Sequence, residues 1–401
     1  MPIAASAAGP AFAQEDEETF WQGIASEYDV TREVIQLENG NWGMMPRPVQ
    51  ERYLDEVARV NRDTSYYARR GMWKDIRAIH EQLAGSLGVP PAEIAFTRNA
   101  TEALKVLIGG YNRLEPGDSV LYADLDYDSM QLSMDSLARR KGASVVRITI
   151  PEAGDAQAII DAYDAAFTAN PGVRLALLTH ISHRTGLVIP VREIARLARA
   201  RGIDTIVDAA HSWCQLDFTL PDLDCDFVGL NGHKWLGAPL GVGILHIRDD
   251  ALGKIDRDLA SPPDAPDSVS ERIETGTMNG AALLTIPAAL AFHQRIGGAR
   301  KEARLRALRD RWVTALRDLP QVEILTPDTA RSCVAITSFR IAGKTSVAEN
   351  QEIVAQLLSR HRIFTVHRSG VSSGACVRVT PALFNNFEEM DRLASAIRAL
   401  V

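Results

Sequence analysis

The chain has 401 residues and a net charge of −7, with 51 acidic and 44 basic side chains. These charges are spread along the chain, which excludes the basic stripe of a nucleic-acid-binding protein. No run of about 18 apolar residues predicts a membrane span. The length exceeds what one core usually supports, so we expect a large domain and a smaller one. The cysteines show no zinc or disulfide spacing and are expected to be mostly buried thiols: Cys214, Cys225, Cys333 and Cys376.

The first residues, 1–14, are mostly small and uncharged. The segment Ala11–Gln14 has the small-x-small form that signal peptidase cleaves, but a basic region and a long apolar run are missing. Two interpretations therefore stay open: the remnant of an export signal, which would place the protein in the periplasm, or a flexible arm of a cytoplasmic protein. Residues 15–50 lack a core of their own, and we expect them to pack with the small domain.

Short apolar runs alternate with amphipathic stretches in the first two thirds of the chain, which predicts strands alternating with helices. Nearly all-apolar strands in such an order belong to an α/β fold, whose mainly parallel sheet is covered by helices on both faces. Ligands bind at the carboxyl ends of these strands. A polar, proline-rich loop at 256–272 precedes a region of mixed helices and strands. The expected strands are 119–124, 144–150, 174–180, 204–210 and 242–247.

Asp208 and Lys234 narrow the chemistry most. Asp208 ends a strongly apolar strand, where a buried carboxylate needs a cation or a strong donor; the alternative is a cap on the following helix. Lys234 lies in the glycine-rich loop "NGHKWLGAPLGVG" with no acidic neighbour until Asp249. Desolvation there would lower its pKa and favour a Schiff base, the alternative being a solvated surface lysine. A carboxylate for a pyridinium nitrogen and an amine for an aldehyde are what pyridoxal phosphate requires.

A phosphate site is predicted in "FTRNATEALKVLIGG", which indicates a strand, a polar turn and a helix. The backbone N–H groups of Ala100, Thr101 and Glu102, with the Thr101 hydroxyl, would face an anion at the start of that helix. Many helices begin in this way, so the motif carries weight only beside Asp208 and Lys234.

Together these motifs resemble the class V aminotransferase family of fold type I pyridoxal phosphate enzymes, the group with cysteine desulfurases, kynureninase-like enzymes and isopenicillin N epimerase. The likeness runs from about residue 35 to the C-terminus and is most specific in "VDAAHSWCQL" and "NGHKWLGAPLGVG". It implies a large cofactor-binding domain at 51–282, with a mainly parallel, seven-stranded sheet between helices. It also implies a smaller α+β domain at 283–401.

The same resemblance assigns roles around the cofactor. Lys234 would be the Schiff-base lysine and Asp208 the partner of the ring nitrogen. His211 would lie near the phenolic oxygen, and His233 on the phosphate. Tyr127 stands where the family has a ring-stacking aromatic or histidine.

Three further positions follow from the family's motifs. His183 stands where many members have an asparagine that reaches the phenolic oxygen, so Ser182 is an alternative donor. Thr277, in "ETGTMN", matches a loop that reaches the neighbouring subunit's phosphate, which implies a homodimer with shared sites. Arg378, in "ACVRVTPALFNNFEEMD", would bind the substrate's α-carboxylate, the alternative being an arginine on a solvated strand. Candidates for shaping the substrate site are Asn39, Trp42, Tyr66, Tyr67 and Arg69.

Other chemistries fit less well. The segment "DLDYDSM" has alternating acids but lacks the glycine and the glutamate of a calcium loop. Asp208, His211 and His233 could form a metal triad, but the nearby lysine would repel the ion. No G-x-G-x-x-G opens a helix after the first strand, which disfavours a nicotinamide cofactor. A cofactor-free scaffold on the same fold remains the non-catalytic alternative.

The resemblance implies reaction at the α-carbon of an amino acid through an external aldimine. The segment "IFTVHRSGVSSGA" contains no reactive cysteine, so desulfuration is disfavoured, and transamination, epimerisation and decarboxylation stay open. If the arm is an export signal, the chain resembles the exported, epimerase-like branch that tailors the glutamyl side chain of the siderophore pyoverdine. A free amino acid substrate is the alternative.

Overall fold

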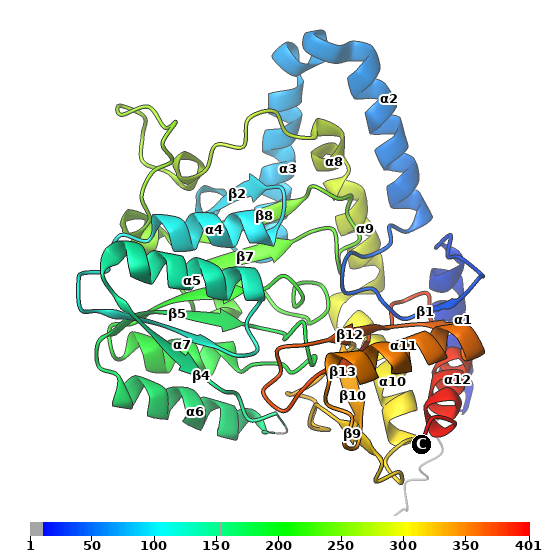
Figure 1. The fold of residues 1–401 in the computed structure, drawn as a ribbon. Coiled ribbons are helices and arrows are strands. Elements are labelled where there is room, and N and C mark those ends of the chain that lie inside the picture. Colours follow the sequence, from blue (N-terminus) through cyan, green and yellow to red (C-terminus); the bar gives the residue numbers. More distant parts are fainter. Residues whose placement is uncertain (1–10, 153) are drawn as a thin grey trace, which may run out of the picture.

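The computed structural model describes residues 11–152 and 154–401. Most of the predicted N-terminal arm, residues 1–10, lies outside the described residues, and residues 11–14 belong to helix α1 (Ala11–Ser26). Within the described part of the chain, no helix combines the length and the apolar character needed to cross a membrane. The predicted α/β fold with a mainly parallel central sheet is confirmed (Figure 1).

The central sheet has seven strands in the order β2-β8-β7-β6-β5-β3-β4. Only β8 runs antiparallel to its described neighbours, β2 and β7. β7 is absent from the strands expected above, because Gly229 and Asn231 interrupt its apolar run. The strand bounds are β2 Ile94–Thr97, β3 Ser119–Ala123, β4 Ser144–Ile148, β5 Val173–Thr179, β6 Asp204–Asp208, β7 Phe227–Asn231 and β8 Gly243–Ile247.

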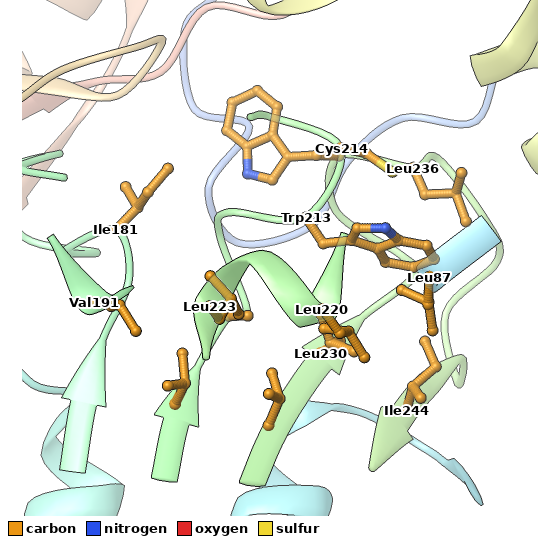
Figure 2. Close-up of a cluster of buried hydrophobic side chains, with 14 of the residues drawn as sticks. Leu87, Ile181, Val191, Trp213, Cys214, Leu220, Leu223, Leu230, Leu236 and Ile244 are labelled. Atoms are coloured by element: carbon orange, nitrogen blue, oxygen red, sulfur yellow. The ribbon is translucent and has the colours of Figure 1, made fainter. Parts of the chain in front are cut away.

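Helices cover both faces of this sheet, because alternate strand residues point to opposite sides. On one face, the buried cluster around Ile206 is covered by α4 (Ala100–Gly110) and α5 (Asp128–Lys141). On the other face, Leu230 and Ile244 belong to a larger cluster, part of which Figure 2 shows. The helices that contribute to this cluster include α3 (Met72–Leu87), α6 (Ala156–Ala169), α7 (Val191–Arg199) and α9 (Ile286–Ile296).

The C-terminal region builds a second, antiparallel sheet in the order β12-β13-β10-β9. Trp312 and Phe339 are buried between this sheet and its helices. The strands are β9 Val322–Ile324, β10 Thr337–Ile341, β12 Val366–Arg368 and β13 Cys376–Val379. The helices are α10 Gly298–Thr314, α11 Val347–His361 and α12 Phe387–Arg398.

The N-terminal segment contacts this second sheet region rather than forming a core. Strand β1 (Ile35–Gln36) pairs in parallel with β11 (Ile363–Phe364), and Glu38 bridges to Thr380. Next come α2 (Arg47–Arg70) and α3, which project from the body as a long hairpin (Figure 1). A short helix, α8 (Gly280–Leu284), packs against both. The segment thus places Glu38 beside β12 and β13 of the second sheet.

Candidate active site

A cavity of about 720 Å³ opens at the carboxyl ends of the central strands, with the second sheet on its other side. Most of the predicted site residues line it: Ala100, Thr101, Tyr127, His183, Asp208, His211, His233, Lys234, Thr277 and Arg378. The predicted residues that do not line it are Asn39, Trp42, Tyr66, Tyr67, Arg69, Glu102 and Ser182. The topology therefore brings residues as far apart in the sequence as Ala100 and Arg378 into one site.

Lys234 lies in the loop after β7, with its side-chain nitrogen 3.0 Å from Nε2 of His211. Its backbone is tightly held, because the N–H of Gly43 donates to the His233 carbonyl over 2.8 Å. Burial lowers the pKa of Lys234 to about 8, although the charges of Asp208 and Glu38 act in the opposite direction. The amine is therefore readily deprotonated near neutral pH, as a Schiff-base lysine must be.

Asp208 ends β6 and is 5% exposed. One of its oxygens accepts a 2.9 Å hydrogen bond from the Ala210 N–H, and the other has no hydrogen-bond partner among the described residues. Burial raises the pKa of Asp208, opposed by the Ala210 N–H and the charge of Lys234. A buried carboxylate with a free oxygen is costly unless a cationic donor from a ligand meets it in the cavity.

The start of α4 offers fewer anion donors than the sequence predicts. The Ala100 N–H donates to Asn231 Oδ1 over 2.7 Å, and the Glu102 N–H donates to the capping Asn99 side chain over 2.9 Å. Thr101 lines the cavity, and its N–H and hydroxyl have no partner among the described residues. The anion site is thus centred on Thr101, since two of the three predicted backbone donors are already satisfied by asparagines.

Three histidines face the cavity in the neutral state. Burial holds the pKa of His211 and of His183 well below the usual range and lowers that of His233 to about 4. The Nδ1 atoms of all three are buried without a partner among the described residues. Tyr127 meets His183 edge to face, with ring centroids 5.2 Å apart. Neutral imidazoles that line one cavity fit a polar ligand, because each ring carries both a donor and an acceptor.

The predicted alternative donor, Ser182, is occupied elsewhere. Its side chain is fully buried, and Oγ accepts from the N–H groups of Arg184 and Thr185. The hydroxyl therefore stabilises the turn after β5 instead of reaching the cavity. The neighbouring His183 is the residue from this turn that does line it.

Arg378 lies on β13 and is 1% exposed. Its guanidinium donates over 2.6 Å to the His183 carbonyl and over 2.6 Å to Glu38 Oε1. Arg368, which sequence reasoning missed, lies 3.6 Å from the same Glu38 oxygen, with 31% of its side chain exposed. Pairing of β12 with β13 places both arginines on one face of the second sheet. Two guanidinium groups share one carboxylate here, which leaves one positive charge unmatched.

The residues proposed to shape the substrate site do not line this cavity. Asn39 is buried and donates to the Thr380 carbonyl over 2.8 Å, and Trp42 is 55% exposed. The Tyr67 hydroxyl donates to Asp75, because α2 breaks at Thr64 and turns this side chain toward α3. Tyr66 is exposed on the same hairpin, and Arg69 lines a separate cavity of about 360 Å³.

These groups fit pyridoxal phosphate. The unpartnered Asp208 oxygen matches a pyridinium N–H, Lys234 matches the aldehyde, and Thr101 matches the phosphate. The neutral His183 and His211 line the same cavity. The fold and the site together define a pyridoxal phosphate-dependent enzyme of fold type I.

The sequence profile of the family Aminotransferase class-V matches residues 46–393. The chain therefore belongs to this family, and its cofactor is pyridoxal 5'-phosphate.

The similar proteins include an epimerase and a cysteine desulfurase. Isopenicillin N epimerase of Streptomyces clavuligerus is 31% identical over 386 residues, which are 92% of this chain and 95% of that protein. A probable cysteine desulfurase of Pyrococcus abyssi is 24% identical, over 95% of this chain and 97% of that protein. Among solved structures, an apo cysteine desulfurase from Thermococcus onnurineus NA1 has a TM-score of 0.82 at 22% identity. The alignment covers 95% of this chain and 98% of that one, so the fold is shared throughout.

Proposed function

We propose that this chain moves a proton at the α-carbon of an amino-acid group, and that epimerisation is its reaction. The contact that carries the proposal is the 3.0 Å approach of the Lys234 amine to His211 Nε2 inside the cavity. When bound, pyridoxal phosphate supplies an electron-poor ring that stabilises negative charge at the α-carbon. Similarity to two isopenicillin N epimerases, at 31% and 29% identity over most of the chain, supports this choice.

Each of these side chains has a separate role in the proposed reaction. Lys234, with its pKa lowered to about 8, takes the α-proton on one face, and neutral His211 accepts a hydrogen bond from the protonated amine. Epimerisation then requires a proton to be delivered to the opposite face of the α-carbon. Asp208 holds a proton on the ring nitrogen, because a buried carboxylate stabilises a cationic partner strongly. Arg378 and Arg368 together bind the substrate's carboxylate, which matches the one positive charge that Glu38 leaves over.

Desulfuration is not proposed. Residues 369–375 contain no cysteine, and buried arginines hold this loop: Arg184 donates to the Gly370 carbonyl and Arg340 to those of Gly374 and Ala375. Cys376 is buried, and burial raises its pKa to about 11. A sulfur acceptor needs an accessible thiolate on a mobile loop.

A second candidate is modification of an N-terminal glutamyl residue on a peptide, as in tailoring of a pyoverdine precursor by transamination or by decarboxylation with oxygen as oxidant. Exposed Leu240 and half-exposed Tyr127 line the cavity, which gives it an apolar wall beyond what a free amino acid needs. This candidate goes with the proposed export signal and a periplasmic location, which cell fractionation of the full-length protein tests.

We further propose a homodimer with shared active sites, in which Thr277, although it lines the cavity of its own chain, reaches the phosphate of the neighbouring subunit. Members of the family are often dimeric, and Tyr66 and Trp73 leave exposed aromatic surface on the hairpin of α2 and α3. Sedimentation tests the assembly. Mixing Lys234→Ala and Thr277→Ala proteins tests sharing, because a heterodimer would then contain one intact site.

The decisive experiment incubates the holoenzyme in deuterated water with a panel of free amino acids, glutamyl peptides and isopenicillin N-type peptides. Epimerisation predicts deuterium at the α-carbon and a mixture of stereoisomers, with no change in the heavy atoms. Loss of the amino group or of a carboxyl group from a glutamyl peptide would instead support the second candidate. Lys234→Ala, which lacks the proton-carrying amine, is the matched control.

A further inference from the structure

Lys301 is a second buried lysine close to the cofactor lysine. It lies in the first turn of α10, is 5% exposed, and donates from its side-chain nitrogen to the carbonyl oxygen of Trp235. Trp235 directly follows Lys234. A residue from a distant helix thus bonds the backbone one residue beyond the cofactor lysine.

This placement of a charge is energetically unfavourable. No carboxylate lies within ion-pair distance of Lys301 among the described residues, whereas buried lysines are almost always paired. A cation in the first turn of a helix also opposes the helix dipole. Burial accordingly lowers the pKa of Lys301 to about 8. An apolar side chain of similar length would be better for stability alone.

The first turn of α10 also contacts the segment after β6, which carries His211. Glu302 accepts a 2.8 Å hydrogen bond from the Asp217 N–H, and the Cys214 thiol lies close enough to affect the charge of Lys301. Cys214 and Leu236 belong to one buried cluster, where the segment after β6 meets the loop after β7 (Figure 2). The turn therefore contacts the backbone segments of both His211 and Lys234.

We propose that Lys301 is a positioning residue for Lys234, holding the Trp235 carbonyl so that the cofactor lysine points into the cavity. On the opposite side, the Gly43 N–H holds the His233 carbonyl, and a β-carbon at Gly43 would lie 1.9 Å from the Lys234 carbonyl oxygen. The carbonyl of the residue before Lys234 and the carbonyl of the residue after it are therefore each held by one hydrogen bond. The inference rests on Lys234 as the cofactor lysine and not on the reaction proposed above.

The test separates positioning from stability by comparing Lys301→Met, which keeps length without charge, with Lys301→Gln, which keeps an N–H donor. We expect the Lys301→Met apoprotein to melt at or above the wild-type temperature. Its dissociation constant for pyridoxal phosphate, from absorbance titration, should rise about tenfold or more. Lys301→Gln should recover part of that affinity. The absorption band of the cofactor on Lys234 should also shift its pH midpoint in Lys301→Met.

The matched control is Lys254→Met, because Lys254 has a carboxylate partner, Asp204, at the opposite end of β6. This variant should melt lower and bind the cofactor like wild type. Binding by Lys301→Met within about twofold of wild type would overturn the proposal. The proposal would also be overturned if both Lys301 variants lost melting temperature in proportion to their loss of cofactor affinity. Lys234→Ala in the same series checks the underlying assignment, since a lysine-linked band that survives there would refute the role of Lys234 whatever Lys301 does.

Discussion

The amine of Lys234 and Nε2 of His211 lie 3.0 Å apart. The two groups nevertheless have well-separated pKa values. The pKa of Lys234 is about 8 and that of His211 lies well below its usual range, both mainly because of burial. At neutral pH the lysine is therefore the donor and Nε2 the acceptor, which leaves the imidazole proton on Nδ1. That N–H is buried and has no partner among the described residues.

Capture of pyridoxal phosphate by the apoprotein should depend on pH through this lysine. Only the neutral amine attacks an aldehyde, so the rate should fall about tenfold for each pH unit below 8 and level off above it. Stopped-flow absorbance measures the rate. Lys234→Ala should show no lysine-linked band, and a rate that stays flat between about pH 6 and 8 would contradict the lowered pKa.

Asp208→Asn should separate cofactor binding from stability. Replacing the charge removes a charged hydrogen bond of about 1.5–3 kcal/mol, so cofactor affinity should fall roughly 10- to 150-fold. The folded-state pKa of Asp208 is raised, so its ionisation destabilises the fold once the pH exceeds the ordinary aspartate value. The apoprotein variant should therefore melt at or above the wild-type temperature at neutral pH. Calorimetry of the apo forms checks this, and a large loss of apoprotein stability would argue against an unpaired buried charge.

The central residues of the site could be predicted because their signals are local. Asp208 ends an apolar strand and Lys234 follows another within a glycine-rich loop, and a parallel sheet brings such ends together. Glu38 and Arg368 could not be placed in this way. Their approach depends on β1 joining β11 and on β12 pairing with β13, which are contacts between distant parts of the chain.

The misassigned positions have a common physical cause. The donors at Ala100 and Glu102 were expected from the helix start, but side chains that the pattern does not identify, Asn231 and Asn99, satisfy them. The Tyr67 hydroxyl donates to Asp75 across the hairpin of α2 and α3, a contact between helices that periodicity does not indicate. Backbone periodicity predicts where an element begins and ends. It does not predict which polar side chain forms hydrogen bonds with the backbone groups there.

Glu38→Gln and Arg368→Gln should shift the pKa of Lys234 in opposite directions. Glu38 raises the pKa of Lys234 and Arg368 lowers it, so the pH midpoint for cofactor capture should fall in the first variant and rise in the second. Glu38→Gln should also cost about 3–5 kcal/mol of unfolding free energy, because it leaves the buried Arg378 charge without its partner. Denaturant unfolding and the capture assay measure the two effects. Shifts of the midpoint in the same direction would show that these groups do not act through their charges.

Gly40→Ala tests how closely the Arg378 guanidinium must fit. A β-carbon at position 40 would lie 2.4 Å from Nη2 of Arg378, and the guanidinium is held in place by Glu38 and the His183 carbonyl. We expect a cost of about 1–3 kcal/mol in unfolding free energy, as for other overpacked sites, with weaker binding of carboxylate substrates.

The same substitution at Gly23 is the control, because that glycine lies inside α1 with no atom within 4 Å of an added β-carbon. Gly23→Ala should stabilise the protein by about 0.5–1 kcal/mol, since alanine loses less conformational entropy in a helix. Opposite signs for one chemical change would attribute the loss at position 40 to the contact with Arg378. Equal stability of the two variants would mean that the guanidinium can move aside, and that its bonds to Glu38 and His183 do not fix its position.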